Sequence, residues 1–114
     1  MSDPRRPLIK ICGVTRPEDA ERAAALGADM IGLNFVPASP RYLDPEAGDR
    51  LSEIVAAAGD ATLAGVFVDE DPDRIEELAA WAALDLVQLH GDETPEAVRR
   101  FGERAIRVFR RRLR

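Results

Sequence analysis

The only cysteine of this 114-residue chain, Cys12, ends a short apolar run and is followed by a glycine. A deprotonated cysteine can act as a general base, and a nearby cation favours the thiolate. Lys10 lies two residues earlier and therefore shares one face of an extended strand with Cys12. Most lone cysteines are buried structural thiols, so this residue alone leaves both interpretations open. A single cysteine excludes an intrachain disulfide.

The only histidine, His90, also ends a strand-like run, residues 86–90, and is followed by Gly91. Gln88 and His90 alternate with aliphatic residues in that run, so the two polar side chains point to one face. The alternative interpretation is an ordinary surface or satisfied core histidine. One cysteine and one histidine without further ligand spacing do not make a metal site, so we expect no bound metal.

A third candidate, Arg41, lies in a loop over residues 37–42, directly after another strand-like run. Its planar guanidinium can bind a carboxylate through two parallel hydrogen bonds. Prolines at positions 37 and 40 stiffen the loop, which reduces the entropy lost when the arginine side chain is ordered. The alternative interpretation is a solvated loop arginine without a ligand.

These residues are positioned by a repeated unit, in which a Thr or Asp lies at or just before a proline that opens an acidic, alanine-rich segment. The prolines fall at positions 17, 45, 72 and 95. A Thr or Asp oxygen can accept an orphan backbone N–H, and proline suits the first helical turn. The pattern predicts helices over residues 17–26, 45–58, 72–83 and 95–101, with a capping box of Thr15 and Glu18 at the first. Strands are predicted over residues 8–13, 30–35, 63–69, 86–90 and 105–109.

The strict alternation of strand and helix predicts parallel strands joined by right-handed helical crossovers. One face of these strands is aliphatic, and the other is small or polar towards the C-terminal ends. We expect the third strand to place Ala64, Val66 and Val68 on the aliphatic, helix-covered face, opposite Gly65 and Phe67. An open doubly wound sheet would have two aliphatic faces in its central strands. The pattern therefore favours an α/β fold of the (β/α)8 TIM-barrel type, with its site at the C-terminal strand ends.

Five segments, in order and at compatible spacing, resemble the phosphoribosylanthranilate isomerase family. They span residues 10–13, 27–35, 39–42, 65–68 and 87–91, and the resemblance covers residues 8–109. It implies an Amadori rearrangement in tryptophan biosynthesis, in which the small-molecule phosphosugar N-(5-phosphoribosyl)anthranilate becomes 1-(2-carboxyphenylamino)-1-deoxyribulose 5-phosphate. By this resemblance Cys12 is the general base and Arg41 holds the anthranilate carboxylate.

The same resemblance implies that Lys10, Gln88 and His90 belong to the substrate-binding pocket. It implies no organic cofactor, because the imine nitrogen formed on ring opening is itself the electron sink. The general acid of the family, an aspartate on the sixth strand, has no counterpart in this sequence. Neither do the phosphate-binding loops that follow the seventh and eighth strands.

We divide the chain into an N-terminal tail (residues 1–7), the N-terminal half of a TIM-barrel isomerase domain (residues 8–109) and a basic C-terminal tail (residues 110–114). The sequence supplies about four βα units and a fifth strand, whereas a complete barrel has eight units. We interpret it as a truncated chain, a frameshifted reading frame or the product of a split gene. On this interpretation the chain alone is inactive.

Two other functions stay open. A different phosphosugar enzyme of the same barrel type, such as indole-glycerol-phosphate synthase, is disfavoured by Cys12 and Arg41, because that chemistry is expected to use lysine and glutamate. A non-catalytic or vestigial half-barrel would associate with itself or with a complementing C-terminal half. Unpaired strand edges and exposed aliphatic faces favour such association.

The composition, with 46% hydrophobic and 32% charged residues, is typical of a soluble globular protein. The net charge of -5 argues against specific nucleic-acid binding, which needs a basic surface. We interpret the arginines concentrated between positions 99 and 114 as leading into a solvated tail. No apolar run reaches the roughly 20 residues that cross a bilayer. No signal-peptide pattern is present, so we expect a cytoplasmic protein.

Overall fold

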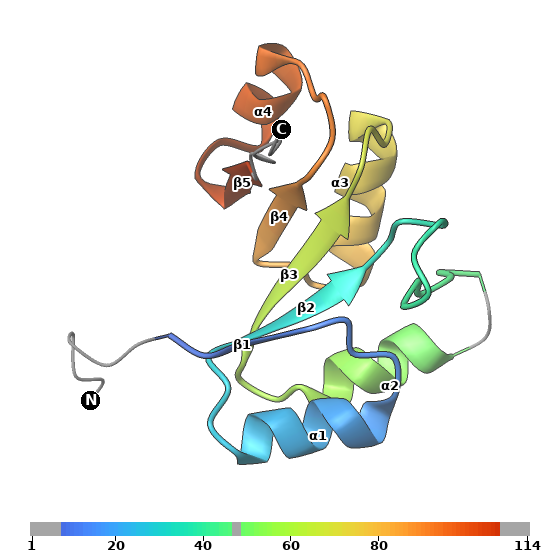
Figure 1. Ribbon diagram of the computed structural model, residues 1–114, viewed down its shortest axis with the longest axis vertical. Coiled ribbons are helices and arrows are strands. Elements are labelled where there is room, and N and C mark those ends of the chain that lie inside the picture. Colours follow the sequence, from blue (N-terminus) through green and yellow to red (C-terminus); the bar gives the residue numbers. More distant parts are fainter. Residues whose placement is uncertain (1–7, 47–48, 108–114) are drawn as a thin grey trace, which may run out of the picture.

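The computed structural model describes residues 8–46 and 49–107, and strands and helices alternate along them as predicted (Figure 1). The strands are β1 (Lys10–Cys12), β2 (Met30–Asn34), β3 (Thr62–Phe67), β4 (Leu86–Leu89) and β5 (Ala105–Arg107). The helices are α1 (Pro17–Ala25), α2 (Arg50–Ala57), α3 (Pro72–Trp81) and α4 (Pro95–Phe101), and a 3-10 helix, η1 (Gly102–Arg104), precedes β5. Residues 108 and 109 of the predicted fifth strand lie outside the described residues.

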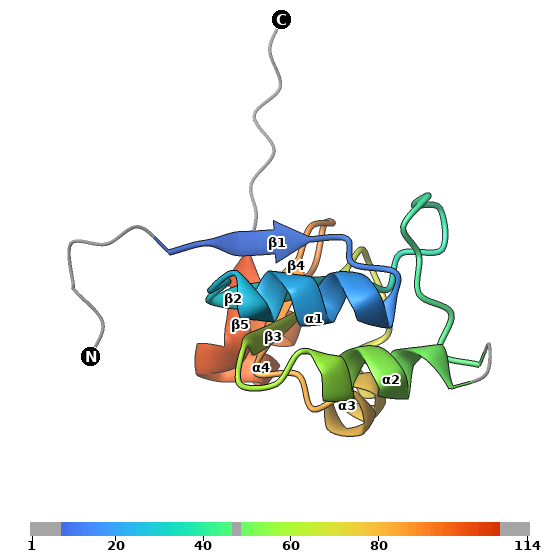
Figure 2. The same ribbon diagram turned by 90° about the horizontal axis from the view of Figure 1, so that it is seen from below.

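All five strands run parallel and pair in the order β1-β2-β3-β4-β5. Each helix therefore connects neighbouring strands, and right-handed crossovers place successive helices on the same face of the sheet. Figure 2 shows the helices gathered on one side of the strands. Among the helices of the described ranges, none is long and apolar enough to cross a membrane.

The hydrophobic core lies between the helices and the sheet. Ile31 and Leu33 of β2 and Leu89 of β4 are fully buried there. The rings of Phe35 and Phe67 stack in the same layer, with their centroids 5.3 Å apart. Each fully buried side chain of this size stabilises the fold by about 1.5–3 kcal/mol, so this face of the sheet determines the stability of the chain.

The predicted facing of β3 is wrong. The strand register pairs Cys12 with Gly32 and Gly32 with Ala64, and residues paired in this way point to the same face. Ala64 and Val66 therefore lie on the face of Cys12, and Phe67 lies fully buried on the helix-covered face. Because β3 is apolar on both faces, alternation cannot distinguish them, and the Phe67 ring instead packs against Phe35 on the covered face.

Two of the predicted helix starts are confirmed. At α3 the Asp71 side chain accepts the backbone N–H of Asp73 at 3.0 Å. At α4 the Thr94 hydroxyl accepts the backbone N–H of Ala97 at 3.2 Å. Each cap satisfies one of the backbone donors that the first helical turn leaves unpaired.

The predicted start of the first helix is also confirmed, since α1 begins at Pro17, but its predicted capping box is wrong. The N-cap of α1 is Arg16, whose side chain makes no capping hydrogen bond, so Thr15 precedes the helix without capping it. The predicted start of the second helix is wrong, because α2 begins at Arg50 and not at residue 45. The Asp44 carboxylate instead accepts the backbone N–H of Glu46 at 2.9 Å, and such a local turn competes with helix formation.

Two aspartates join the N-terminal ends of neighbouring strands. Asp29, directly before β2, accepts the backbone N–H of Ile9 at 2.8 Å. Asp85, directly before β4, accepts the backbone N–H of Leu63 at 2.9 Å. A charged acceptor makes these hydrogen bonds stronger than ordinary ones, so they help to fix the strand register at this end of the sheet.

Candidate active site

A cavity of about 300 Å³ lies on the sheet face opposite the core, over the first four strands. Its lining consists of side chains from these strands and from the residues that directly follow them: Lys10, Cys12, Asn34, Val36, Val66, Val68, Gln88 and His90. Four residues that the sequence analysis assigned to a site, Lys10, Cys12, Gln88 and His90, are therefore brought together around one cavity.

Cys12 is exposed at the end of β1, so it is not a buried structural thiol. Gly32 lies beside it on β2, where a β-carbon would sit 3.5 Å from the Cys12 sulfur and 3.6 Å from Lys10 Cε. Cys12 and Lys10 thus flank the same glycine and point to one face. The backbone N–H of Gly13 donates to the Gly32 carbonyl at 3.0 Å and holds the end of β1 in place.

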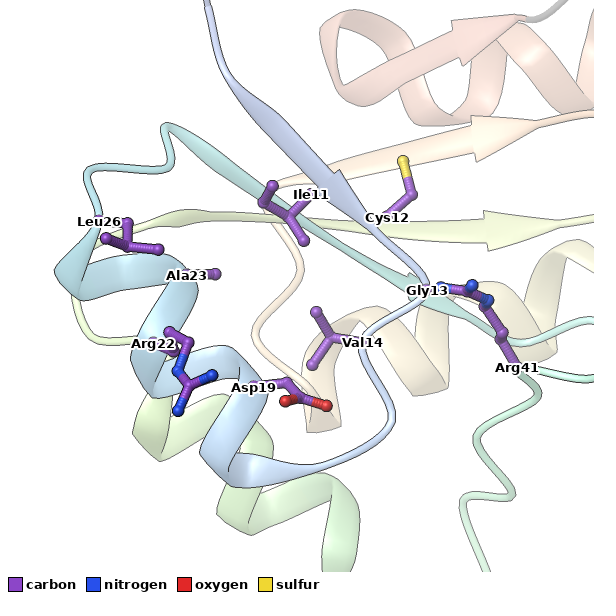
Figure 3. A pocket seen from close by; sticks show the side chains of 9 residues that line it. All are labelled: Ile11, Cys12, Gly13, Val14, Asp19, Arg22, Ala23, Leu26 and Arg41. Carbon is purple, nitrogen blue, oxygen red and sulfur yellow. The ribbon is translucent and has the colours of Figure 1, made fainter.

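Arg41 lines a second cavity, of about 310 Å³, between β1 and α1 (Figure 3). Its side chain passes so close to Gly13 that a β-carbon at position 13 would collide with Arg41 Cδ, and Gly13 has a φ of 73°. The positive φ favours glycine at position 13. Cys12 lines this cavity as well as the first. Arg41 and His90 therefore lie in two adjacent cavities that meet at Cys12, and not in one shared cavity.

The Arg41 loop is held at the end of β2. The backbone N–H of Leu43 donates to the Asn34 carbonyl at 2.8 Å, which returns the loop to the strand that it left. Within the loop, the backbone N–H of Arg41 donates to the Ser39 hydroxyl at 3.1 Å. Burial raises the pKa of the adjacent Tyr42 above its ordinary value of 10.0, and nearby carboxylates add to the shift.

The lining of the first cavity includes a thiol, an ammonium group, an imidazole and two carboxamides, but no carboxyl group. Ammonium and amide groups donate hydrogen bonds to anionic or hydroxyl-rich ligands, and a thiolate can accept a proton. Across residues 8–46 and 49–107, no group of three His, Cys, Asp or Glu side chains could hold a metal ion. The site thus offers acid–base and hydrogen-bonding chemistry from its own side chains.

The sequence analysis missed two carboxylates, Asp69 and Glu93, which we call the carboxylate clamp. Glu93 is only 8% exposed and accepts the backbone N–H groups of Asp69, at 2.8 Å, and Gly91, at 3.2 Å. Asp69 in turn accepts the backbone N–H of Asp92 at 2.8 Å. The available signal was an acidic residue just beyond each of two successive strands, beside the Gly91 that follows His90.

Sequential parallel βα units, one helix-covered face and a cavity over the strands near their C-terminal ends define the class of protein. They are the features of (β/α)8-barrel enzymes, whose active sites lie at the C-terminal end of the strands. The structure is a partial barrel of this class, with five strands and four helices described.

A sequence model of the family described as N-(5'-phosphoribosyl)anthranilate (PRA) isomerase matches residues 9–113. The chain is 49% identical over 88 residues to the N-(5'-phosphoribosyl)anthranilate isomerase of Solibacter usitatus, covering 77% of this chain and 42% of that protein. It is 43% identical over 105 residues to the Bordetella pertussis isomerase, covering 92% of this chain and 47% of that protein. The chain belongs to the N-(5'-phosphoribosyl)anthranilate isomerase family.

Solved structures of the family are similar in fold. The phosphoribosyl anthranilate isomerase of Thermus thermophilus gives a TM-score of 0.81 at 38% identity, covering 90% of this chain and 52% of that one. A phosphoribosyl anthranilate isomerase in complex with reduced 1-(o-carboxyphenylamino)-1-deoxyribulose 5-phosphate, abbreviated rCdRP, gives 0.80 at 37% identity, with the same coverage. The chain spans about half the length of the relatives that it matches.

Proposed function

We propose that this chain contributes the Cys12 half of a phosphoribosylanthranilate isomerase active site, in a cytoplasmic enzyme of tryptophan biosynthesis. The observation that carries the proposal is the position of Cys12, which is exposed where two cavities meet. Arg41 lines one of these cavities, and Lys10, Gln88 and His90 line the other. The membership of the chain in the isomerase family supports this assignment.

In the proposed reaction, the ribose ring oxygen is protonated and the C1–O bond breaks as the lone pair of the anthranilate nitrogen forms a C1=N bond, which leaves a protonated, positively charged imine. Cys12, as thiolate, removes the proton from C2. The electron pair of that C–H bond forms a C1–C2 double bond, and the C1=N electrons move to the nitrogen. The resulting enol-amine then tautomerises to the aminoketose. The substrate thus supplies its own electron sink, and the reaction needs no organic cofactor.

The charges around Cys12 suit this chemistry. Lys10 shares the face of Cys12 and flanks the same glycine, so a cationic side chain lies on the same side of the sheet as the thiol. Arg41 can hold a carboxylate through two hydrogen bonds. We assign the anthranilate carboxylate to the Arg41 guanidinium. The hydroxyl-bearing sugar takes the cavity with Gln88 and His90.

We further propose that the five-stranded unit alone does not turn over substrate. The lining of its first cavity contains no carboxyl group, so the general acid and the phosphate-binding groups must come from the remaining βα units of a complete barrel. The chain would then act only when those units are present, whether covalently joined or as a separate half.

The test separates binding from turnover. rCdRP should slow the reaction of Cys12 with a thiol reagent, and Arg41→Ala should abolish this protection. Isomerisation should be absent in the chain alone and should appear when a fragment carrying the remaining strands of a relative is added. Cys12→Ser should abolish the restored activity. Activity that survives Cys12→Ser would refute the assigned base, and a complex that folds but stays inactive would refute the proposed function.

The open sheet supports a second candidate role, in which the half-barrel only associates with another chain. In the described part of the molecule β1 pairs on one side only, and the large apolar side chains at 8, 9 and 11 on or beside it are exposed. Leu26, which lines the neighbouring cavity with Ile11, is 78% exposed. An apolar strand edge of this kind favours pairing. Sedimentation tests this role: Ile11→Lys should shift an associated chain towards monomer, and a chain that is already monomeric would exclude it.

A further inference from the structure

The carboxylate clamp lies next to the cavity but does not line it. Glu93 belongs to the segment after β4, while the two N–H groups that it accepts come from Asp69, after β3, and Gly91. A buried carboxylate is costly unless it is paired or hydrogen-bonded, so its place between two loops needs a reason. The same carboxylate oxygen, Glu93 Oε2, accepts both of these N–H groups, which draws the two loops to one point.

The backbone of His90 is fixed on both sides. Its own N–H donates to the Phe67 carbonyl at 3.0 Å, which continues the sheet ladder. The next residue, Gly91, donates to Glu93, and the residue after it donates to Asp69. The backbone that carries the His90 side chain therefore cannot rotate without breaking one of these hydrogen bonds.

Position 91 has no room for a side chain. A β-carbon there would lie 2.5 Å from Asp69 Oδ1 and 2.8 Å from Oδ2. Asp69 itself has a φ of 50°, an unusual conformation for a residue with a side chain. The Asp69 carboxylate of one loop thus packs directly against the Gly91 backbone of the other. Val68 and His90, which directly precede Asp69 and Gly91, both line the cavity.

We propose that Asp69 and Glu93 are positioning residues, whose carboxylates lock the ends of β3 and β4 together and hold the His90 imidazole at the cavity that contains Cys12. The contribution of this role to catalysis rests on the proposed function, in which His90 contacts the substrate. The locking of His90 is a property of the chain itself and can be measured without substrate.

The chain offers a matched control. Asp85 accepts the backbone N–H of Leu63 at 2.9 Å and so joins β3 and β4 at their other end, away from the cavity. Glu93→Gln and Asp69→Gly perturb the carboxylate clamp, and Asp85→Asn perturbs the equivalent bond at the opposite end. Glycine adopts the φ of position 69 without strain, so Asp69→Gly removes a carboxylate and leaves the backbone conformation accessible.

The primary measurement is the NMR spectrum of the His90 ring, which is unambiguous because the chain has one histidine. Glu93→Gln and Asp69→Gly should each shift or broaden the ring signals and weaken rCdRP binding by up to about tenfold, because a freed imidazole must be ordered again when the ligand binds. Asp85→Asn also removes a charged hydrogen bond between β3 and β4, so it should lower the free energy of unfolding about as much as the two clamp substitutions do. It should leave the ring signals and the rCdRP affinity unchanged.

The proposal is overturned if folded Glu93→Gln or Asp69→Gly gives the same His90 ring signals as Asp85→Asn, because the clamp would then be merely structural. If Glu93→Gln unfolds, Asp69→Gly decides the question. Failure of the chain completed by the remaining βα units to bind rCdRP would count against the proposed function, while the ring signals would still test the positioning of His90.

Discussion

Replacing Gly65 by alanine should destabilise the chain without changing the reactivity of Cys12. Gly65 lies on the helix-covered face of β3, where a β-carbon would meet Leu84 Cδ1 at 2.5 Å and Phe67 Cε2 at 2.9 Å. Both neighbours are buried, and Phe67 is stacked on another ring, so neither can move freely. Adding atoms to a packed core costs about 1–3 kcal/mol. With two such close approaches, we expect Gly65→Ala to lower the free energy of unfolding by about 2 kcal/mol.

Gly32→Ala is the matched substitution on the cavity face. A β-carbon there would lie 3.3 Å from Cys12 Cα and 3.5 Å from its sulfur, which is tight but does not require a core residue to move. We expect a cost below about 1 kcal/mol. The new methyl group would cover one side of the thiol, so Cys12 should react more slowly.

Denaturant unfolding, followed by circular dichroism, gives the free energy of unfolding by linear extrapolation. The labelling rate of the native chain with a thiol reagent reports Cys12 alone, because there is one cysteine. Equal destabilisation by Gly32→Ala and Gly65→Ala would refute the assignment of the two faces. Slower labelling of folded Gly65→Ala would refute it as well.

Three further predictions follow from the contacts. Thr94→Ala should lower the free energy of unfolding by about 1 kcal/mol, as loss of an N-cap does, whereas Thr15→Ala should leave the denaturant midpoint unchanged. Burial is the main cause of the raised pKa of Tyr42, and the folded chain therefore holds this proton more tightly than the unfolded chain does. The free energy of unfolding should fall as the pH rises above 10.0 and through the raised pKa. Tyrosinate absorbance and denaturant unfolding at each pH check this. Arg104→Ala breaks a partly exposed ion pair with Glu76 at 2.7 Å and should cost about 0.2–1 kcal/mol in low salt, less in high salt, by the same unfolding measurement.

The elements that the sequence predicted well are those with local causes. The caps at Asp71 and Thr94 depend on an acceptor and a proline within a few residues, and both formed. Strict alternation of strands and helices was enough to predict the parallel sheet. The alternation of polar and aliphatic side chains along β1 and β4 was enough to place Cys12 and His90 on one face, because each of those strands has one clearly polar side.

The errors occurred where local signals conflict. Asp44 and the proline after it are typical of a helix start. The Asp44 carboxylate instead accepts the backbone N–H of Glu46 and forms a turn, and α2 begins at Arg50. In β3 both faces are apolar, so only the register with β2 reveals that Ala64 shares the face of Cys12. The carboxylate clamp joins residues 23 and 24 positions apart, and no pattern within one element predicts such a contact.

The position of the Cys12 side chain depends on the register of β1. A slip of one residue in β1 would turn Cys12 towards α1 and present Ile11 to the cavity. Asp29 opposes such a slip by holding the N–H of Ile9 at the start of β1, and the Gly13 N–H holds its end on Gly32. These bonds lie at both ends of a three-residue strand in which no residue is buried. Substitution of Asp29 should therefore reduce the reactivity of Cys12 although the two side chains lie at opposite ends of the strand.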